Sequence, residues 1–491
     1  MGGRPSGERR NRAAMATSTP QFGIARSTPP MSQRGPTRVE QLAQFVSSAR
    51  FEDISEPVCE QLRLRVLDSL GCALGALDVE PVRMVGQQVG EFGGAPLCTL
   101  ICAGRSAPDR AALHNGALVR YLDFNDSYLA PGETCHPSDN LAPVLAAAEY
   151  AHADGRALLT ALAVAYQVQN RLSEVAPVRA QGFDHTTQGA YAVAAGVARA
   201  LALDPHRTAN AIAIAGTSLN ALRVTRTGEL SHWKGLAYPA TAFAATNAAF
   251  LAMRGVTGPR EVFEGNKGFI ETIAGPFEID WQRENLESVG RTILKKYNAE
   301  IHSQSALEAL LALRSEHNLA AEEVDRIELD TFQVAYDIIG GGEEGSKYEV
   351  GSKEEADHSL PYLLAVTLLD GQVLPVQYLP DRIVRDDVQE LLRRVEVRPD
   401  PELSRRFPEE HSARVRLHLR DGRVLEREQH DYEGFHTRPM DWDAVAEKFD
   451  RLAERHIDPD RRARIKDAVS ELEQLNVEYL TRLLAIPSTR H

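Results

Sequence analysis

The sequence predicts a mainly α protein with a second, smaller α+β domain. From residue 38 to residue 275, apolar side chains recur three and four positions apart almost throughout, which is helical spacing. Residues 324–332 instead alternate apolar and polar side chains, as a half-buried strand does. The length of 491 residues allows two or three domains with large buried cores. We therefore expect an all-helical domain followed by an α+β domain.

The chain begins with a predicted leader, residues 1–36, which is rich in Arg, Ser, Pro and Gly and has Glu8 as its only acid. A transit peptide has this kind of composition. However, no amphipathic helical period is visible, and Pro20, Pro29 and Pro30 oppose one. We therefore favour a disordered leader over a transit peptide.

Residues 37–275 are predicted to form the all-helical domain. Gly and Pro separate segments that are rich in Ala and Leu. Ala is the best helix former, and its small side chain lets helices pack closely. We expect helices at 141–152, 157–175, 189–203, 207–222 and 240–254.

Residues 276–440 are predicted to form the α+β domain. Strands are expected at 324–332 and 395–397, and a hairpin at 413–429 is expected to turn at Asp421 and Gly422. Helices are expected between these strands, at 303–317, 358–369 and 387–394. The tail, residues 441–491, returns to helical spacing, and we expect it to pack back on the helical domain; capping the α+β domain is the alternative.

Charge and composition exclude several classes of function. The formal net charge of −14 opposes binding to nucleic acid and to acidic membranes. No continuous apolar run reaches the ~18 residues that span a bilayer. The five cysteines are an odd and sparse set, which indicates a reducing cytoplasm rather than a disulfide framework. Cys98 and Cys102 flank residues that look like a buried strand, so we expect no metal site there.

The most informative polar segment is residues 121–140. It lies between apolar helical segments and contains Asp123, Asp126, Asp139, His136 and the hydroxyls of Ser127, Tyr128 and Thr134. A simple connection needs only Gly, Pro, Asn and Ser, so this density of acids around a histidine indicates chemistry.

Two further segments place a basic group near the start of an expected helix. His185 opens the helix after residue 184, where it could meet an anionic ligand, or it is a surface histidine. Lys234 precedes a helix expected to begin near Pro239. The helix dipole there disfavours a cation unless an anion is shared, although a solvated loop lysine is the alternative.

Residues 294–304 combine two cations, a carboxylate and a histidine, namely Lys295, Lys296, Glu300 and His302. This mixture suits binding carboxylates and moving a proton, and an exposed charged connector is the alternative. The acidic, glycine-rich stretch 340–357 is not a phosphate loop; it is either a mobile flap or a disordered surface loop. No nucleotide fingerprint, HExxH or GxSxG occurs, which favours acid–base chemistry without an organic cofactor.

Together and in this order, these segments resemble the MmgE/PrpD family, the iron-independent 2-methylcitrate dehydratase group. The matching blocks span about residues 40 to 440 and read LDFNDSY then HPSDN, GFDHTTQGAYAVAAGVARAL, SHWKGLAYPATAFAATNAAFLAMRGVTGP, KKYNAEIHSQSALEALLAL and ADHSLPYLLAVTLLDG. The resemblance implies a helical domain built from both ends of the chain, an α+β domain, an active site in the cleft between them and a homodimer. It also implies a di- or tricarboxylate substrate and no iron–sulfur cluster.

The resemblance also implies roles for particular residues. The family's motif positions fall on Asp123, Ser127, His136, His185 and Lys234, with Ser127 standing where the family has Thr. A second basic position falls on Lys295 or Lys296, and Tyr336 matches a site tyrosine loosely. Glu300 stands where the decarboxylase branch has a histidine, which argues against decarboxylation.

Our hypothesis is dehydration of a hydroxy-tricarboxylate, with 2-methylcitrate as the first candidate. A proton beside a carboxylate is weakly acidic, so cations must stabilise the intermediate; Lys234 and one of the two neighbouring lysines fit this role. We expect His136 and Asp123 to be the acid–base pair, with Asp123 fixing the imidazole tautomer. His185, Glu300 and His302 are the next candidates. Alternatives are a related epimerase, isomerase or decarboxylase, an aconitase-type iron–sulfur hydratase, and a helical scaffold without activity.

Overall fold

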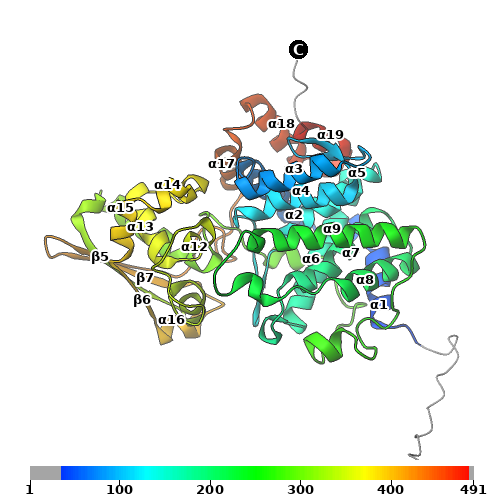
Figure 1. Cartoon of the computed structure of the whole chain (residues 1–491), viewed down its shortest axis with the longest axis horizontal. Coiled ribbons are helices and arrows are strands. Elements are labelled where there is room, and N and C mark those ends of the chain that lie inside the picture. The colour runs from blue at the N-terminus through cyan, green and yellow to red at the C-terminus, as the bar shows by residue number, and fades with distance from the viewer. Residues whose placement is uncertain (1–34, 486–491) are drawn as a thin grey trace, which may run out of the picture. The chain divides into compact units, whose positions relative to one another are not determined.

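The computed structural model describes residues 35–485 (Figure 1). Contacts along the chain separate Met1–Pro36 from Thr37–His491, and the elements below belong to the second unit. Residues 1–34 of the predicted leader lie outside the described residues, so the leader stays a prediction.

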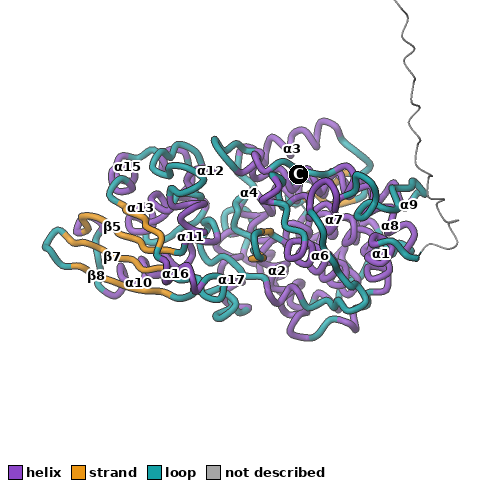
Figure 2. Tube along the Cα trace, turned by 90° about the horizontal axis from the view of Figure 1, so that it is seen from below, coloured by secondary structure: helices purple, strands orange, loops and turns teal. Residues whose placement is uncertain are grey.

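The fold class is confirmed: a large helical part is joined to a smaller part built around a mixed sheet (Figures 1 and 2). The N-terminal helices are α1 Arg38–Ser48, α2 Glu56–Gly75, α3 Glu80–Phe92, α4 Pro108–Tyr121, α5 Leu141–Tyr150, α6 Gly155–Val175, α7 Thr186–Ala200, α8 Pro205–Ser218 and α9 Trp233–Met253. Several begin at the caps that the sequence offers. The side chains of Asp154 and Asp204 accept hydrogen bonds from the backbone N–H groups of Ala157 and Arg207, which stabilises the starts of α6 and α8.

The C-terminal helices are α17 Trp442–Ala453, α18 Pro459–Ser470 and α19 Val477–Leu484. Their apolar side chains belong to the same buried core as those of the N-terminal helices. α17 packs on α2 at Gly71, where a Cβ atom would lie 3.1 Å from the Cα of Phe449. Glycine at this position therefore permits close approach of two helices that are far apart in the sequence.

The smaller part contains a four-stranded sheet in the order β6-β5-β7-β8. Its strands are β5 Val324–Thr331, β6 Val395–Pro399, β7 Ala413–Leu419 and β8 Val424–Gln429; β5 and β6 are parallel and the other pairs antiparallel. Its helices are α10 Gln304–Glu316, α11 Gln333–Ala335, α12 Lys353–Ala356, α13 Leu360–Asp370, α14 Pro380–Ile383, α15 Asp386–Leu392 and α16 Pro401–Arg406. Alternate residues of β7 are buried against α10 and its neighbours, which is the pattern that predicted the hairpin.

Two local predictions need correction. Residues 37–275 are not all-helical, since they contain the hairpins β1 Cys98–Leu100 with β2 Gly104–Ser106 and β3 Tyr128–Ala130 with β4 Glu133–Cys135. Of these strands, β1 agrees with the buried strand expected between Cys98 and Cys102. The second hairpin lies inside the polar segment 121–140. α9 begins at Trp233 rather than near Pro239, so the proline lies inside the helix. Packing explains this, because Pro239 fits closely against Gly116 of α4.

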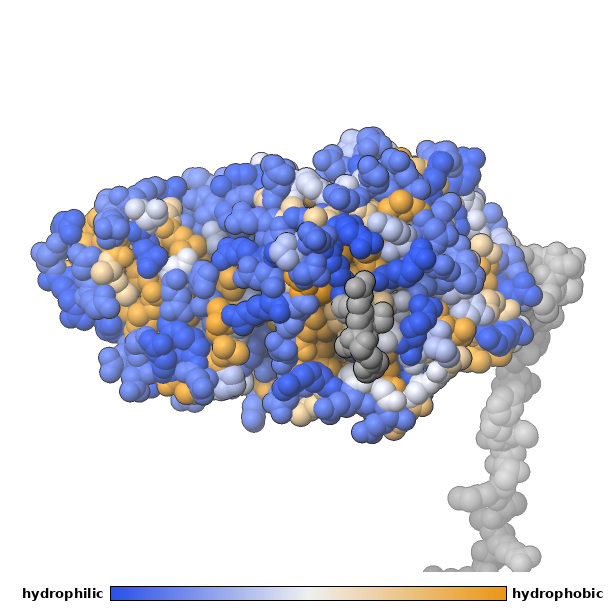
Figure 3. Space-filling view, turned by 90° about the horizontal axis from the view of Figure 1, so that it is seen from above, coloured by the Kyte–Doolittle hydropathy of each residue, from blue (hydrophilic) through white to orange (hydrophobic). Residues whose placement is uncertain are grey.

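α9 has the length and apolar composition of a helix that could cross a membrane, which the sequence analysis did not recognise. In the structure, 61% of its most apolar stretch is buried, and it packs on α4, α7 and α8. Its composition is therefore that of a core helix. On the face shown in Figure 3, hydrophilic residues cover most of the surface and apolar residues lie in small groups between them.

Lys448 of α17 joins three distant segments beneath the helical core. Its Nζ lies 2.6 Å from Asp68 Oδ1 of α2 and donates to the backbone carbonyls of Phe124 at 2.8 Å and Lys295 at 2.9 Å. Both charged side chains are buried. The C-terminal helix thus positions two loops that carry candidate site residues.

We expect Lys448→Met to lower the free energy of unfolding by about 3–5 kcal/mol, because it leaves Asp68 as a buried acid without its cation. Urea unfolding monitored by circular dichroism measures the change. Lys466→Met is the matched control, since the ion pair of Lys466 with Asp450 is partly exposed; it should cost about 1 kcal/mol or less. Equal losses in the two variants would contradict the anchoring role of Lys448.

Candidate active site

A polar cavity lies between the helical part and the α+β part. Its walls come from loops that follow α4 and precede α7, and from the segments around 295–302 and 338–358. The lining residues are Arg120, Asp123, Glu133, Thr134, His136, Arg179, His185, Arg223, Arg226, Lys295, Glu300, His302, Ile338, Glu344 and His358. Six of the ten candidate residues from the sequence are among them, although they lie as far apart in the chain as Asp123 and His302.

Asp123 is the centre of the charged network. It directly follows Leu122 at the end of α4 with a left-handed backbone, φ 54°, which Asp tolerates better than most residues. Its Oδ1 accepts from Arg120 Nη1 at 2.9 Å and from Lys295 Nζ at 2.7 Å. Burial alone would raise the pKa of this carboxyl, but Arg120 and then Lys295 hold it well below its usual range. Asp123 therefore stays ionised and holds cations in place, so it cannot supply a proton.

Lys234 projects from the first turn of α9 and is buried. Its Nζ donates to Asp357 Oδ1 at 2.9 Å, and it lies 2.8 Å from His358 Nδ1 and 3.9 Å from Asp123 Oδ2. These carboxylates explain how a lysine is tolerated at a helix start, because they supply the anions that the dipole requires. Burial lowers the pKa of Lys234 to about 8, despite Asp357 and Asp123. An ammonium with this pKa can donate a proton near neutral pH.

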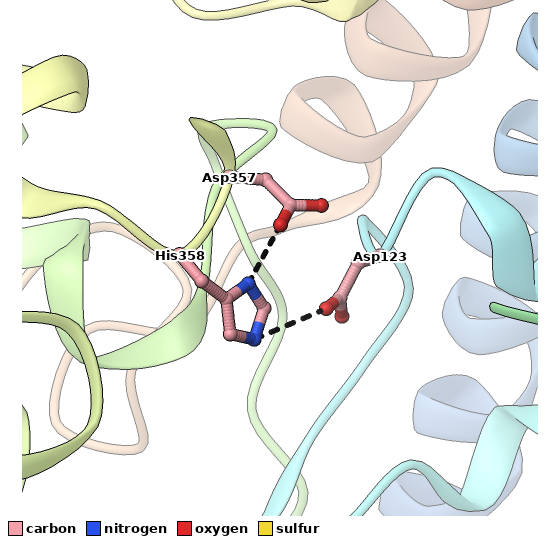
Figure 4. Close-up of side chains that lie close together, drawn as sticks. All are labelled: Asp123, Asp357 and His358. Atoms are coloured by element: carbon pink, nitrogen blue, oxygen red, sulfur yellow. Dashed lines mark hydrogen bonds and ion pairs between the residues drawn. The ribbon is translucent and has the colours of Figure 1, made fainter. Parts of the chain in front are cut away.

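Asp123, Asp357 and His358 also form the one group of three ligand-type residues that we find in the described chain, with ligand atoms within 4.8 Å of one another. Figure 4 shows the His358 ring between the two carboxylates. Both carboxylates already have ammonium partners, because Lys353 Nζ lies 2.5 Å from Asp357 Oδ2 and Lys295 contacts Asp123. This charge balance disfavours a divalent cation at the group.

His136 lies at the end of the β3–β4 hairpin. Its Nδ1 donates to the backbone carbonyl of Asp126 at 2.7 Å, and Ser127 Oγ lies 3.2 Å from the same nitrogen. The tautomer of His136 is therefore set by the Asp126 carbonyl, and Nε2 carries the lone pair. The expectation that Asp123 fixes this tautomer was wrong. Burial lowers the pKa of His136 well below its ordinary value, so the imidazole is neutral and can accept a proton.

His185 packs edge-on against His136, with ring centroids 5.5 Å apart. Its Nδ1 lies 3.4 Å from Asp184 Oδ1, whereas its buried Nε2 has no hydrogen-bond partner within the described residues. Burial lowers the pKa of His185 to about 3. The prediction that His185 opens a helix is correct, since α7 begins at the next residue and Asp184 accepts from the N–H of Thr186.

Glu300 and His302 form the wall on the α+β side. The Glu300 carboxylate accepts from the backbone N–H of His302 at 2.7 Å, and burial raises the pKa of Glu300. Burial lowers the pKa of His302 to about 3, and its Nδ1 lies 3.4 Å from His411 Nε2. His302 is thus a neutral imidazole that also packs on Phe332.

The remaining candidates divide into those near the cavity and those away from it. Of the two adjacent lysines, Lys295 is buried at Asp123, whereas Lys296 is half-exposed and pairs with Glu433 outside the cavity. Ser127 does not line the cavity but contacts His136 from behind. Tyr336 begins a π-helical turn that packs on the sheet core, and it does not line the cavity.

Several residues that line the cavity, and Asp357 beside it, were not identified from the sequence. Asp357 and His358 stand directly before α13 within the ADHSLPYLL block, so their block was recognised but their role was not. Arg179 and Arg223 carry no local signal, because single charged residues in surface-like loops are common. Glu344 lies in the acidic stretch 340–357, which was recognised although no residue in it could be assigned a role. Only the folded chain shows that these loops face one cavity.

Comparison with known proteins identifies related chains. The model of the MmgE/PrpD N-terminal domain matches residues 40–282, and that of the MmgE/PrpD C-terminal domain matches residues 297–474. A mitochondrial 2-methylcitrate dehydratase of Yarrowia lipolytica is 28% identical over 430 residues, 80% of this chain and 79% of the relative. An alkylcitrate dehydratase of a fungal species is 27% identical over 495 residues, and the cis-aconitate decarboxylase of Mus musculus is 25% identical over 478; each alignment covers 92% of this chain and 94% of the relative.

Proposed function

Because the chain belongs to the MmgE/PrpD family, we propose that it is a hydro-lyase that removes water from a hydroxy-tricarboxylate, with 2-methylcitrate as the first substrate to test. One observation carries the proposal: the buried cation Lys295 and the neutral imidazole of His136 line one small polar cavity, and a second buried cation, Lys234, lies directly behind its wall, 3.9 Å from Asp123 Oδ2. Such a cleft attracts a polyanion and holds a base for its C–H proton.

In the proposed reaction, His136 Nε2 accepts the proton from the carbon beside a carboxylate. The Lys295 ammonium stabilises the negative charge that develops on that carboxylate, an effect typically worth ~3–4 kcal/mol for one preorganised donor. Lys234 donates its proton to the departing hydroxyl, which leaves as water while the C–O bond breaks and the C=C bond forms. His136 then returns its proton to Lys234 through solvent, so no group is consumed.

The cavity lining also bears on the size of the substrate's apolar part. Ile338 is the only apolar side chain among the lining residues. A methyl group needs little apolar surface, whereas a long alkyl chain needs a run of apolar contacts. This favours 2-methylcitrate or citrate over a citrate with a long alkyl substituent.

Incubation of the purified protein with 2-methylcitrate, citrate and cis-aconitate, each in EDTA, tests the proposal. We expect enoate absorbance to appear with 2-methylcitrate and to be unaffected by the chelator, because ammonium groups and not a metal ion stabilise the intermediate. Loss of activity in EDTA would contradict the mechanism. Released CO₂ would indicate a decarboxylase, and deuterium incorporation without enoate an epimerase or isomerase. No change with any of the acids would indicate a scaffold. The homodimer and the cytoplasmic location stay predictions.

A further inference from the structure

Two arginines of the helical part meet one glutamate of the α+β part inside the cavity. Arg179 precedes α7, Arg223 precedes α9, and Glu344 lies in the loop that follows the π-helical turn Tyr336–Gly340. An Nη2 atom of each guanidinium lies 3.2 Å from the same oxygen, Glu344 Oε1. All three side chains line the cavity together with His136 and Lys295. A carboxylate is therefore already bound between these two arginines, and it belongs to the protein.

The neighbouring charges leave this carboxylate as the shared partner of both arginines. Asp184 is fully buried and is held by Arg226, whose Nε lies 2.5 Å from Oδ2. Arg223 Nη1 lies farther from the same oxygen, at 3.9 Å. In the part of the chain that the structure describes, Glu344 is the only carboxylate in ion-pair distance of Arg179. If Glu344 withdrew, the Arg179 guanidinium would lose its ion-pair partner among the described residues and Arg223 would keep only the distant Asp184. Glu133 also lines the cavity, but it accepts from the backbone N–H of Arg179 at 3.1 Å and makes no ion pair with either guanidinium.

The loop that carries Glu344 has the features of a segment that can change conformation. Residues 341–350 contain no helix or strand. Gly341 and Gly345 flank Glu344 with φ values of 106° and 88°, which only glycine adopts readily. The Glu344 side chain is 11% exposed, and its backbone N–H is held by the carbonyl of Asp337 at 2.9 Å. Withdrawal of the carboxylate thus requires no regular element to unfold.

We propose that Arg179 and Arg223 form the binding subsite for a third carboxylate of the substrate, and that Glu344 occupies this subsite until the substrate displaces it. The inference rests on the proposed function and adds which acids are accepted. In the proposed reaction Lys295 binds a substrate carboxylate at one end of the cavity, and a guanidinium pair suits another carboxylate through paired N–H donors. A tricarboxylate engages both ends, whereas a dicarboxylate leaves Glu344 in place. While Glu344 occupies the arginines, they cannot bind the substrate. The apparent affinity for the tricarboxylate is therefore the intrinsic affinity multiplied by the fraction of molecules in which the arginines are free.

Calorimetric titration with propane-1,2,3-tricarboxylate and with pentanedioate tests the subsite. Neither acid has the hydroxyl that leaves, so binding is measured without turnover. We expect Glu344→Gln to bind the tricarboxylate about tenfold more tightly than the wild type does, since the competitor is removed. Glu343→Gln removes the same charge from the adjacent, exposed residue and should leave both affinities within about twofold. Arg179→Met should weaken tricarboxylate binding at least about tenfold and leave pentanedioate binding within about threefold.

The outcomes separate this inference from the proposed function. Equal tricarboxylate affinities for Glu344→Gln and Glu343→Gln would overturn the subsite, as would an Arg179→Met variant that weakens both acids alike. If the wild type binds neither acid, the proposed function itself fails. Melting curves show whether each variant is folded. Should Arg179→Met not fold, the comparison of the two glutamate variants decides alone, because neither substitution removes a buried cation.

Discussion

Replacing His136 by asparagine should lower kcat by about 10²–10⁴-fold and change KM for the tricarboxylate only a few-fold. The asparagine amide can still donate to the Asp126 carbonyl from the position that His136 Nδ1 occupies, at 2.7 Å in the structure. It offers no lone pair in place of Nε2, so the base is removed while the local fold is kept. Steady-state kinetics with 2-methylcitrate, the proposed substrate, measure the effect.

A second readout distinguishes loss of the base from general damage. In deuterated buffer the wild type should exchange the abstracted hydrogen, and His136→Asn should lose this exchange together with turnover. His114→Gln is the matched control: His114 is a buried histidine of α4 that does not line the cavity, and its Nε2 lies 3.3 Å from the Ile101 carbonyl. The kcat of His114→Gln should stay within several-fold of the wild-type value. Near-normal turnover in His136→Asn would remove His136 from the mechanism.

Lys234→Met should lower kcat by about 10²–10³-fold, the scale of one lost electrostatic or acid group. Asp357 keeps Lys353 and His358 as partners, and Asp123 keeps Arg120 and Lys295, so the charge network survives the loss. Lys296→Met serves as the control, because Lys296 pairs with Glu433 outside the cavity. Equal losses in the two variants would contradict the assignment.

The pH profile tests the role of Lys234 as the acid. Burial depresses its pKa to about 8, so the protonated form predominates below that pH and is lost above it. We expect kcat to fall as the pH rises through about 8. In Lys234→Arg the guanidinium stays charged across this range, so the alkaline fall should vanish while kcat remains low. The acid limb should lie well below pH 6.5, since His136 must stay neutral and burial depresses its pKa. An unchanged alkaline limb in Lys234→Arg would show that another group titrates.

Much of the fold could be predicted because its signals are local. Alternation in β5 and β7 and helical spacing in α6 and α10 each depend on which side of one element faces the core. Two local predictions were wrong because packing against neighbouring elements outweighed the local sequence signal. The proline inside α9 was taken for a helix start, and the β3–β4 hairpin was taken for a loop. In both cases neighbouring elements supply contacts that the segment alone does not encode.

In the candidate site, too, some residues could be found from the sequence and others only from the folded structure. Asp123, His136, His185, Lys234 and the 295–302 segment were found because unusual residue types stand in otherwise apolar or helical surroundings. Their partners were not found: the choice between Lys295 and Lys296 needed the direction of each side chain, and Asp357 and His358 acquire meaning only beside Lys234.

By itself, the sequence determined the mainly α class with its α+β part, the family resemblance and the segments that are proposed to carry the chemistry. All of these follow from spacing and residue type along the chain. Only the tertiary structure decided which charges meet. It replaced Asp123 by the Asp126 carbonyl as the group that orients His136, and it placed Glu344 between Arg179 and Arg223. The physical reason is that protonation state and pairing depend on burial and on neighbours within a few ångströms. Some of these neighbours, such as Glu344 beside Arg179 and Arg223, come from loops more than a hundred residues apart in the chain.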